Sequence, residues 1–251
     1  MTDYNDLADH YIMRRGDINR FDYNRDIEVP AMIKMLGNVA NKNILELGCG
    51  FGDHAKRLSK QHFRKLVGLD LSSKFIQHAR DQNIPHTEFY VKDISKKLPY
   101  KDGNYDIVFS SLALHYLTNL NKIFAEVNRV LKISGLFCFS TGHPIFNLIN
   151  QSKDQIVGVN NINLGRRAIY GNYFDESPKL NNLGSLGKVR MSNFTLETFL
   201  RTALNSGFEL ADYMEAKPAR ATRKYDPWTF KLTSTLPTFI LFKFQKKSIN
   251  Y

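Results

Sequence analysis

A glycine-rich turn between a short apolar run and a helical pattern constrains this chain more than any other feature. The apolar run covers residues 43–47, and the turn that follows contains Gly48, Gly50 and Gly52. Glycines at a strand-to-helix turn allow a tight bend and let a ligand approach the backbone closely. The dinucleotide fingerprint needs a third glycine at position 53, where this chain has Asp53. The turn therefore predicts a ligand-binding α/β sheet and disfavours a nicotinamide-dependent oxidoreductase.

Apolar runs alternate with helical patterns over the first 140 residues, which is typical of a parallel sheet with right-handed crossovers. The predicted strands are 43–47, 66–70, 87–91, 105–110 and 136–140, followed later by 208–215 and 236–244. The predicted helices are two within residues 4–40, then 54–62, 72–81, 120–131 and 195–205.

This rhythm fails over residues 143–190, which are rich in Asn, Gly and Ser. Loops of such length in a compact domain are usually functional or disordered. We therefore predict one domain over residues 1–251. Its parts are a helical N-terminal cap (1–40), a cofactor-binding core (41–142), a substrate-lid insertion (143–190) and the C-terminal part of the core (191–251).

Acidic residues stand at the predicted strand ends. Asp70 follows the glycine turn by about twenty residues, where an acid in a doubly wound sheet bonds ribose hydroxyls. The alternative for Asp70 is a helix N-cap. Asp93 beside Ile94 suits an adenine, because its carboxylate can accept a hydrogen bond from the exocyclic amine of the base. The alternative is that Asp93 is an ordinary loop acid. Glu46, just before the first glycine, suits a cationic ligand better than a pyrophosphate.

Together these features resemble the class I S-adenosylmethionine-dependent methyltransferases, and among them the type 11 family. The resemblance spans about residues 40–142 and rests on the stretches 44–52, 67–72, 98–116 and 126–135. It implies a Rossmann-like, mostly parallel sheet of seven strands with the last strand antiparallel. It also implies S-adenosylmethionine as cofactor and S-adenosylhomocysteine as product. No metal is expected, because no His/Cys cluster has zinc spacing and only Asp93 and Asp106 lie near this edge.

The resemblance further implies which positions line the cofactor. They are Tyr11, Glu46, Gly48, Cys49, Gly50, Asp70, Leu71, Asp93, Ile94, Ser110 and Ser111. Glu46 would sit near the amino group of the cofactor, directly or through water, and Tyr11 near its carboxylate. Backbone groups of Ser110 or Ser111 would contact the methionine portion.

Methyl transfer from a sulfonium is an in-line displacement, and it needs a general base only where the acceptor carries a proton of high pKa. His115 follows the fourth strand and is the candidate base; the alternative is a structural histidine beside Tyr116. His54 is expected at the surface or flanking the cofactor. The candidate substrate contacts are His143, Tyr170, Tyr173, Phe174 and Arg190.

The charge of the chain bears on its acceptor. The net charge is +11, of which +7 falls in residues 141–251. We predict a small-molecule acceptor, and the positive charge is compatible with an anionic one. RNA methylation by the basic second half is an alternative, and a non-catalytic cofactor-binding protein is a weaker one. We see no signal peptide and no apolar run near the ~20 residues of a membrane span. The expectation is a cytoplasmic monomer or homodimer without a membrane partner.

Overall fold

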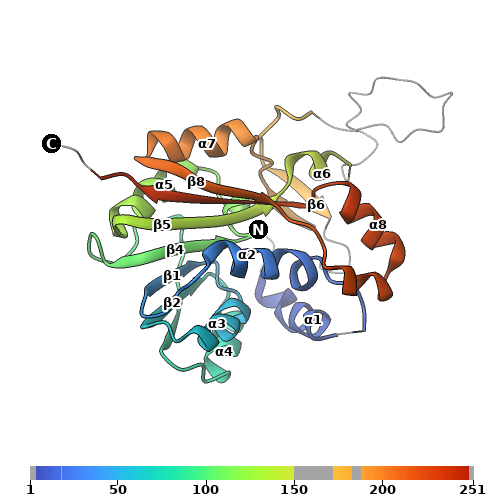
Figure 1. Ribbon diagram of the computed structural model, residues 1–251, viewed down its shortest axis with the longest axis horizontal. Coiled ribbons are helices and arrows are strands. Elements are labelled where there is room, and N and C mark those ends of the chain that lie inside the picture. Colours follow the sequence, from blue (N-terminus) through green and yellow to red (C-terminus); the bar gives the residue numbers. More distant parts are fainter. Residues whose placement is uncertain (1–3, 18, 150–171, 183–187, 249–251) are drawn as a thin grey trace.

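A seven-stranded sheet forms the centre of the computed structural model, which describes residues 4–17, 19–149, 172–182 and 188–248 (Figure 1). The strand order is β3-β2-β1-β4-β5-β9-β8. Strands β1 to β5 are parallel, and β9 is antiparallel to both of its neighbours. The bounds are β1 (Asn43–Leu47), β2 (Lys65–Asp70), β3 (Thr87–Val91), β4 (Tyr105–Ser111), β5 (Leu131–Gly142), β8 (Phe208–Glu215) and β9 (Phe239–Lys246). The predicted seven-stranded sheet with an antiparallel last strand is confirmed.

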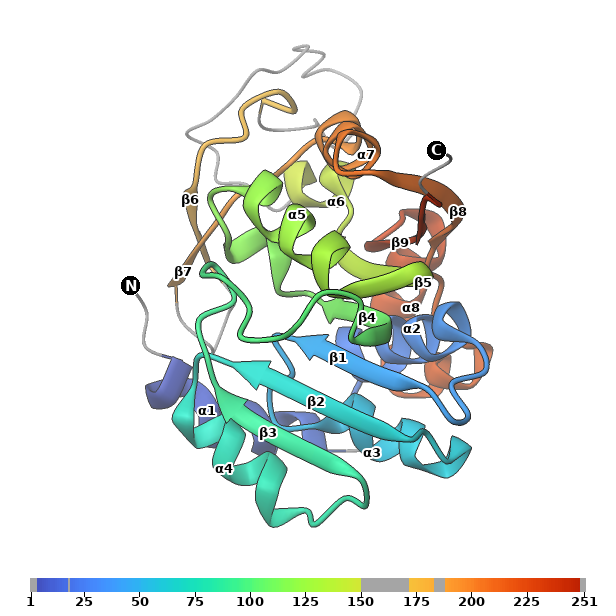
Figure 2. The ribbon, with the colours of Figure 1, turned by 90° about the vertical axis from the view of Figure 1, so that its left-hand side faces the viewer.

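Helices cover both faces of this sheet (Figures 1 and 2). One face carries α2 (Val29–Leu36), α3 (Asp53–Leu58) and α4 (Ser73–Asp81), and the other carries α5 (Leu120–Val130) and α7 (Leu196–Asn205). Side chains alternate along a strand, so Ile44 packs into the first layer and Leu45 into the second. Glu46 therefore points to the same face as Ile44, toward α2 and α3.

Two elements precede α2 within residues 4–40, where two helices in all, α2 included, were predicted. They are α1 (Tyr4–Gly16) and a π-helical turn, η1 (Asn24–Glu28). Helix α1 docks on the start of α4, where the Asn5 side-chain oxygen accepts a hydrogen bond from the Ser72 hydroxyl at 2.8 Å. Ser72 is also the N-cap of α4, because its hydroxyl accepts from the Phe75 N–H. Gly37, with φ of +69°, ends α2.

Several elements differ from the sequence expectation. Within residues 143–190 the structure contains α6 (Pro144–Ile149) and a hairpin of β6 (Lys179–Asn182) and β7 (Lys188–Met191). Strand β5 starts at Leu131 and pairs there with Tyr105, where helix was expected. Between β8 and β9 lie a 3-10 helix, η7 (Arg220–Lys224), and α8 (Pro227–Thr235). Shorter 3-10 turns are η2 (Ser59–Gln61) and η3 (Leu114–Tyr116).

One edge of the sheet collects the candidate residues. The parallel strands β1 to β5 all end at this edge, and β8 ends there too because it runs antiparallel to β9. The segment 216–238, which joins β8 to β9, therefore lies at the same edge as the glycine turn. Ligands of open α/β sheets bind at the carboxyl ends of the strands.

Candidate functional site

The glycine turn is shaped by contacts with the end of β2. The N–H groups of Gly48 and Cys49 both donate to the Leu69 carbonyl, at 2.7 and 2.9 Å. Gly48 has a φ of +75°, and a Cβ at this position would lie 2.3 Å from the Ala113 Cβ. At Gly50, by contrast, no heavy atom lies within 4 Å of the place of a Cβ. The backbone of the turn is therefore packed on one side and open at Gly50, as a bound ligand requires.

Asp70 joins the end of β2 to the turn. Its carboxylate accepts hydrogen bonds from the Gly50 N–H at 2.8 Å and from the Ser72 N–H at 2.9 Å. Burial raises the pKa of the Asp70 carboxyl, and the two N–H groups act in the opposite direction. Since a carboxylate has about four acceptor sites, further ones remain for hydroxyl donors. The helix N-cap is Ser72 rather than Asp70, so the capping alternative for Asp70 is wrong.

The residues that follow β2 and β3 offer a partly apolar surface. The Leu71 side chain is 58% exposed, Ile94 is half-buried and Asp93 is exposed. The Lys92 N–H donates to the Asp70 carbonyl at 2.8 Å, so these strand ends are neighbours. Asp93 accepts from the Ser95 N–H at 2.9 Å, and its hydrogen bonds with Ser95 lower the pKa of the Asp93 carboxyl. This arrangement suits a flat ring beside a hydrogen-bonding carboxylate.

Helix α1 brings Tyr11 against the glycine turn. The Tyr11 ring meets Phe51 and Phe75 edge-on, with ring centroids 6.2 and 5.6 Å away. Its hydroxyl oxygen accepts a hydrogen bond from the Asn24 side-chain amide at 2.8 Å. The predicted position of Tyr11 beside the turn therefore agrees with the structure, while its contact with a cofactor carboxylate stays a prediction.

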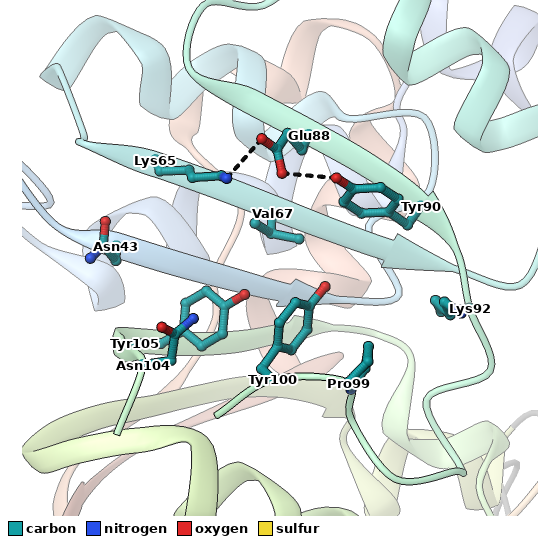
Figure 3. Close-up of a pocket in the computed structure, with 10 residues that line it drawn as sticks. All are labelled: Asn43, Lys65, Val67, Glu88, Tyr90, Lys92, Pro99, Tyr100, Asn104 and Tyr105. Carbon is teal, nitrogen blue, oxygen red and sulfur yellow. Dashed lines mark hydrogen bonds and ion pairs between the residues drawn. The ribbon is translucent and has the colours of Figure 1, made fainter. Parts of the chain in front are cut away.

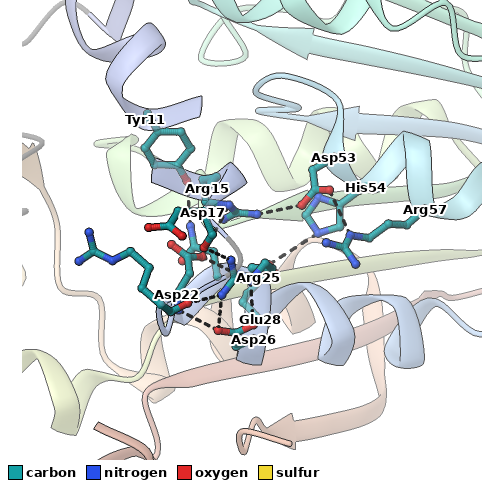
Figure 4. Close-up of polar contacts among 12 residues, drawn as sticks. Tyr11, Arg15, Asp17, Asp22, Arg25, Asp26, Glu28, Asp53, His54 and Arg57 are labelled. Carbon is teal, nitrogen blue, oxygen red and sulfur yellow. Dashed lines mark hydrogen bonds and ion pairs between the residues drawn. The ribbon is translucent and has the colours of Figure 1, made fainter. Parts of the chain in front are cut away.

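An ion-pair network lies next to Tyr11 (Figure 4). The Arg15 guanidinium is 2.9 Å from Asp53 and 3.6 Å from Asp22, and Arg57 is 3.1 Å from Asp53. The same guanidinium lies 5.8 Å from the centroid of the Tyr11 ring. Two cations thus face two carboxylates, and the network joins α1 to the start of α3.

His54 is buried, so its expected surface position is wrong. The side chain lies in α3 between two fully buried carboxylates, 3.2 Å from Glu46 and 3.6 Å from Glu28. Burial alone would lower the pKa of His54, but the contacts with both glutamates outweigh burial and raise this pKa to about 10. Glu46 accordingly faces His54 beneath the turn, and any contact with the cofactor amino group passes through this buried pair or through water.

The carboxyl end of β4 carries two serines and a strained turn. The Ser110 hydroxyl donates to the Leu47 carbonyl at 2.9 Å and is fully buried, whereas Ser111 is half-buried. Leu112 then adopts a φ of +50°, which is unusual for a bulky residue. Its N–H donates to the Ser140 hydroxyl oxygen at 3.0 Å. The turn places Ala113 over Gly48.

His115 lies in η3, beside the end of β7. Its ring is 4.2 Å from the Tyr116 ring, and its carbonyl accepts from the Ser192 N–H at 2.8 Å. Burial lowers the pKa of His115 to about 4. The imidazole is therefore neutral at pH 7 and a weak proton acceptor.

The predicted substrate contacts are spread over several elements. His143, buried after β5, accepts from the Ile145 N–H through Nδ1 at 3.3 Å and places Nε2 3.3 Å from Glu215. The Tyr173 hydroxyl oxygen accepts from the Leu196 N–H at 3.3 Å, and Phe174 is 80% exposed. Arg190 is exposed on β7. Tyr170 lies outside the described residues. Among these, His143 is the one built into the carboxyl edge.

A cavity of about 410 Å³ lies elsewhere on the sheet (Figure 3). It opens on the side of β1 to β4 that the segment 92–104 borders, and Tyr90, Tyr100 and Tyr105 line it. Lys65 and Tyr90 both contact Glu88 there, at 2.7 and 2.9 Å. Since Asn43, Lys65 and Tyr105 begin their strands, this cavity is separate from the glycine turn.

Comparison with known proteins matches the fold described above. Residues 45–139 fit the family described as "Methyltransferase domain". The crystal structure of an S-adenosylmethionine-dependent methyltransferase from Mesorhizobium loti is 27% identical, with a TM-score of 0.74 over 90% of this chain and 98% of that one. The fold and the glycine turn thus define a class I methyltransferase domain. The match to this family over residues 45–139 and the similarity to this solved methyltransferase agree with the resemblance of the chain to the type 11 family.

Two curated relatives carry more specific names. A malonyl-[acyl-carrier protein] O-methyltransferase of Legionella pneumophila is 32% identical over 42% of this chain and 38% of that protein. A fatty-acid O-methyltransferase of Mycolicibacterium smegmatis is 34% identical over 44% of this chain and 41% of that protein. The chain therefore spans less than half the length of these relatives.

The residues at the edge fit S-adenosylmethionine. The open backbone at Gly50, the carboxylate of Asp70 and the exposed Leu71 supply a backbone cradle, a hydroxyl acceptor and an apolar face. In the described part of the chain, no cluster of three His, Cys, Asp or Glu is arranged to hold a metal, and the absence of a metal stays a prediction. None of the described helices has the length and apolar character of a membrane span.

Proposed function

We propose that the protein transfers a methyl group from S-adenosylmethionine to the carboxylate of a small acceptor. A set of exposed cations in the segment 216–238, at the carboxyl edge of the sheet, carries this proposal. None of them forms an ion pair with another described residue. The set consists of Lys217, Arg220, Arg223, Lys224 and Lys231. Unpaired charges of one sign attract the opposite charge to this edge of the sheet.

The names of the two curated relatives support the same acceptor class. Malonyl groups and fatty acids both carry a carboxylate, and both relatives are named as O-methyltransferases. For this chain a carboxylate acceptor is also consistent with His115. A carboxylate is ionised at pH 7 and has no proton to lose, so a neutral histidine with a pKa of about 4 does not limit the reaction.

Catalysis then depends on alignment and exclusion of water. Bound S-adenosylmethionine supplies an electrophilic methyl on a positively charged sulfur. A carboxylate oxygen lone pair forms the new O–C bond while the S–C electron pair stays on sulfur, so no proton moves. Asp70, Asp93 and the glycine turn would hold the cofactor, and His143 would fix the carboxyl edge through its contacts with Ile145 and Glu215. Holding the reacting atoms about 3–3.5 Å apart and in line supplies most of the rate enhancement.

Transfer of a labelled methyl group to a panel of acceptors tests this proposal. The panel contains octanoate, a malonate half-thioester, a catechol, a primary amine and tRNA. We expect label in the methyl esters of the carboxylates. Arg223→Glu with Lys224→Glu should raise the KM of the carboxylate several-fold and leave kcat nearly unchanged. Lys122→Glu, an exposed cation on α5, is the control. Label in the amine or the catechol alone would overturn the carboxylate assignment.

RNA is the second candidate, because the same cations can contact phosphates. RNA methylation predicts label in tRNA and a steep loss of RNA retention as salt is raised. Transfer to tRNA without transfer to carboxylates would replace the proposed function with this one.

A further inference from the structure

Three buried ionisable side chains lie together beneath the glycine turn: Glu28, Glu46 and His54. They come from η1, β1 and α3, and Figure 4 shows His54 aimed at Glu28. Both glutamates are 0% exposed and His54 is 6% exposed. His54 Nδ1 is 3.2 Å from Glu46 Oε1, and Nε2 is 3.6 Å from Glu28 Oε2. Buried charges are costly unless paired, so this cluster requires an explanation.

The two glutamates have different surroundings. Glu28 accepts a hydrogen bond from the Ser140 hydroxyl at 2.6 Å, and Ser111 also contributes a hydrogen bond to it. The Ser140 hydroxyl oxygen in turn accepts from the Leu112 N–H. Glu28 is thus tied to the ends of β4 and β5. Neither oxygen of Glu46 accepts a hydrogen bond from a residue that the structure describes. Its charge is balanced there by His54 alone.

The cluster holds two carboxyl groups around one imidazole, so it contains one more acidic group than basic groups. His54 is protonated, because its contacts with both glutamates raise its pKa to about 10. Burial acts to raise the pKa of Glu28, but His54 and the two serines overcome it and lower this pKa. Burial leaves the pKa of Glu46 raised, and the imidazolium opposes that rise. With both carboxyl groups ionised, two carboxylates and one imidazolium would leave a charge of −1.

Neighbouring groups do not cancel this charge. On the α1 side, Arg15 and Arg57 are balanced by Asp22 and Asp53. Burial raises the pKa of Tyr11 and of Cys49, so both are neutral at pH 7. The Phe109 ring of β4, 5.7 Å from His54, carries no charge. The nearest part of the ligand site therefore feels a field of negative sign that salt screens only weakly.

We propose that Glu28 and His54 are specificity-determining residues that set a single negative charge beneath the glycine turn and so favour S-adenosylmethionine over S-adenosylhomocysteine. The cofactor has a sulfonium, an ammonium and a carboxylate, hence a charge of +1. The product has lost the sulfonium charge and is neutral overall. A buried charge of −1 attracts the first and not the second. The cluster thereby assists release of the product. This inference rests on the cofactor assignment and not on the acceptor.

The ratio of the two dissociation constants, Kd of S-adenosylhomocysteine over Kd of S-adenosylmethionine, tests the proposal. Both constants are measured at pH 7 by calorimetry without acceptor. Glu28→Gln leaves Glu46 and His54, a neutral pair, and should lower the ratio about fivefold. Glu46→Gln leaves Glu28 and His54, also a neutral pair, and should lower the ratio by a similar factor. A purely structural role would weaken both ligands equally and leave the ratio unchanged.

Two further measurements keep the test decisive. Lys56→Gln changes the charge of the same helix by one at an exposed residue outside the Arg15–Asp53 network and should not alter the ratio. If Glu28→Gln does not fold, the ratio is measured in the His54→Gln variant instead. It leaves two carboxylates without a cation, one of which takes up a proton at low pH, so the ratio should rise with pH. A ratio that is constant in every folded variant would overturn the proposal. Absence of cofactor binding in the unmodified protein would instead overturn the cofactor assignment.

Discussion

The Asp70 carboxylate accepts a hydrogen bond from the Gly50 N–H at 2.8 Å, which ties the end of β2 to the glycine turn at the end of β1. Because the same carboxylate also accepts from the Ser72 N–H, it is oriented before any ligand binds. Asp70 therefore combines a structural contact with the geometry expected of a ribose acceptor.

Asp70→Ala should weaken S-adenosylmethionine binding by about 1.5–3 kcal/mol, the usual value of hydrogen bonds to a charged group. Calorimetric titration measures the change. Asp81→Ala, an exposed acid on α4, should leave the affinity unchanged. Equal affinities of the Asp70 variant and the unmodified protein would show that Asp70 does not hold the ribose.

Gly48→Ala should lower the free energy of unfolding by about 2–4 kcal/mol, through a positive φ and a clash with Ala113. Chemical denaturation measures the loss. Gly103→Ala is the matched control, because its φ is +62° and no atom lies within 4 Å of its Cβ position. The free energy of unfolding of that control should fall only by the part that comes from placing an alanine at a positive φ. Adding Ala113→Gly to the Gly48 variant should recover the part due to the clash, and no recovery would contradict the packing argument.

His54 should make stability depend on pH in the alkaline range. Its pKa in the folded protein is about 10, above the ordinary value of 6.5. The stabilisation is therefore complete below pH 6.5 and is lost as the pH rises toward 10, by at most about 1.4 kcal/mol per pH unit. Urea denaturation of the unmodified protein and of His54→Gln should give curves that converge over this range. His78 is a half-exposed histidine on α4 and serves as the control. The curves of His78→Gln and of the unmodified protein should keep the same separation over this range.

His115→Ala should retain turnover within about tenfold, because His115 is not expected to act as a general base. Loss of a general base would lower turnover by about 10²–10⁴-fold. The pKa of about 4 also predicts that turnover shows no titration of this histidine between about pH 5.5 and 8. Steady-state rates across that range measure both effects. A hundredfold loss in the variant would return His115 to the role of base.

Much of the core was predictable because its signals are local. Strands β1, β3 and β8 match their predicted bounds, since each is a short run with apolar residues, and a glycine ends β1 and precedes β8. The start of α4 was predictable from the capping hydroxyl of Ser72. Helix α8 was missed, although Asp226 at its N-cap, Pro227 at its first position and Thr229 form a recognisable start signal. Strand β5 is longer than the predicted strand 136–140, because it begins at Leu131, the last residue of the predicted helix 120–131.

The sequence by itself determined the sheet, its glycine turn and the acid at the end of each early strand. Those follow from spacing along the chain and from the conformations that glycine allows. Only the tertiary structure decided that His54 is buried between Glu28 and Glu46, and that His115 is neutral. A pKa depends on burial and on charges from distant segments, and neither can be obtained from neighbours in the sequence. Glu46 within an apolar strand was the one local sign that a buried cation had to be near.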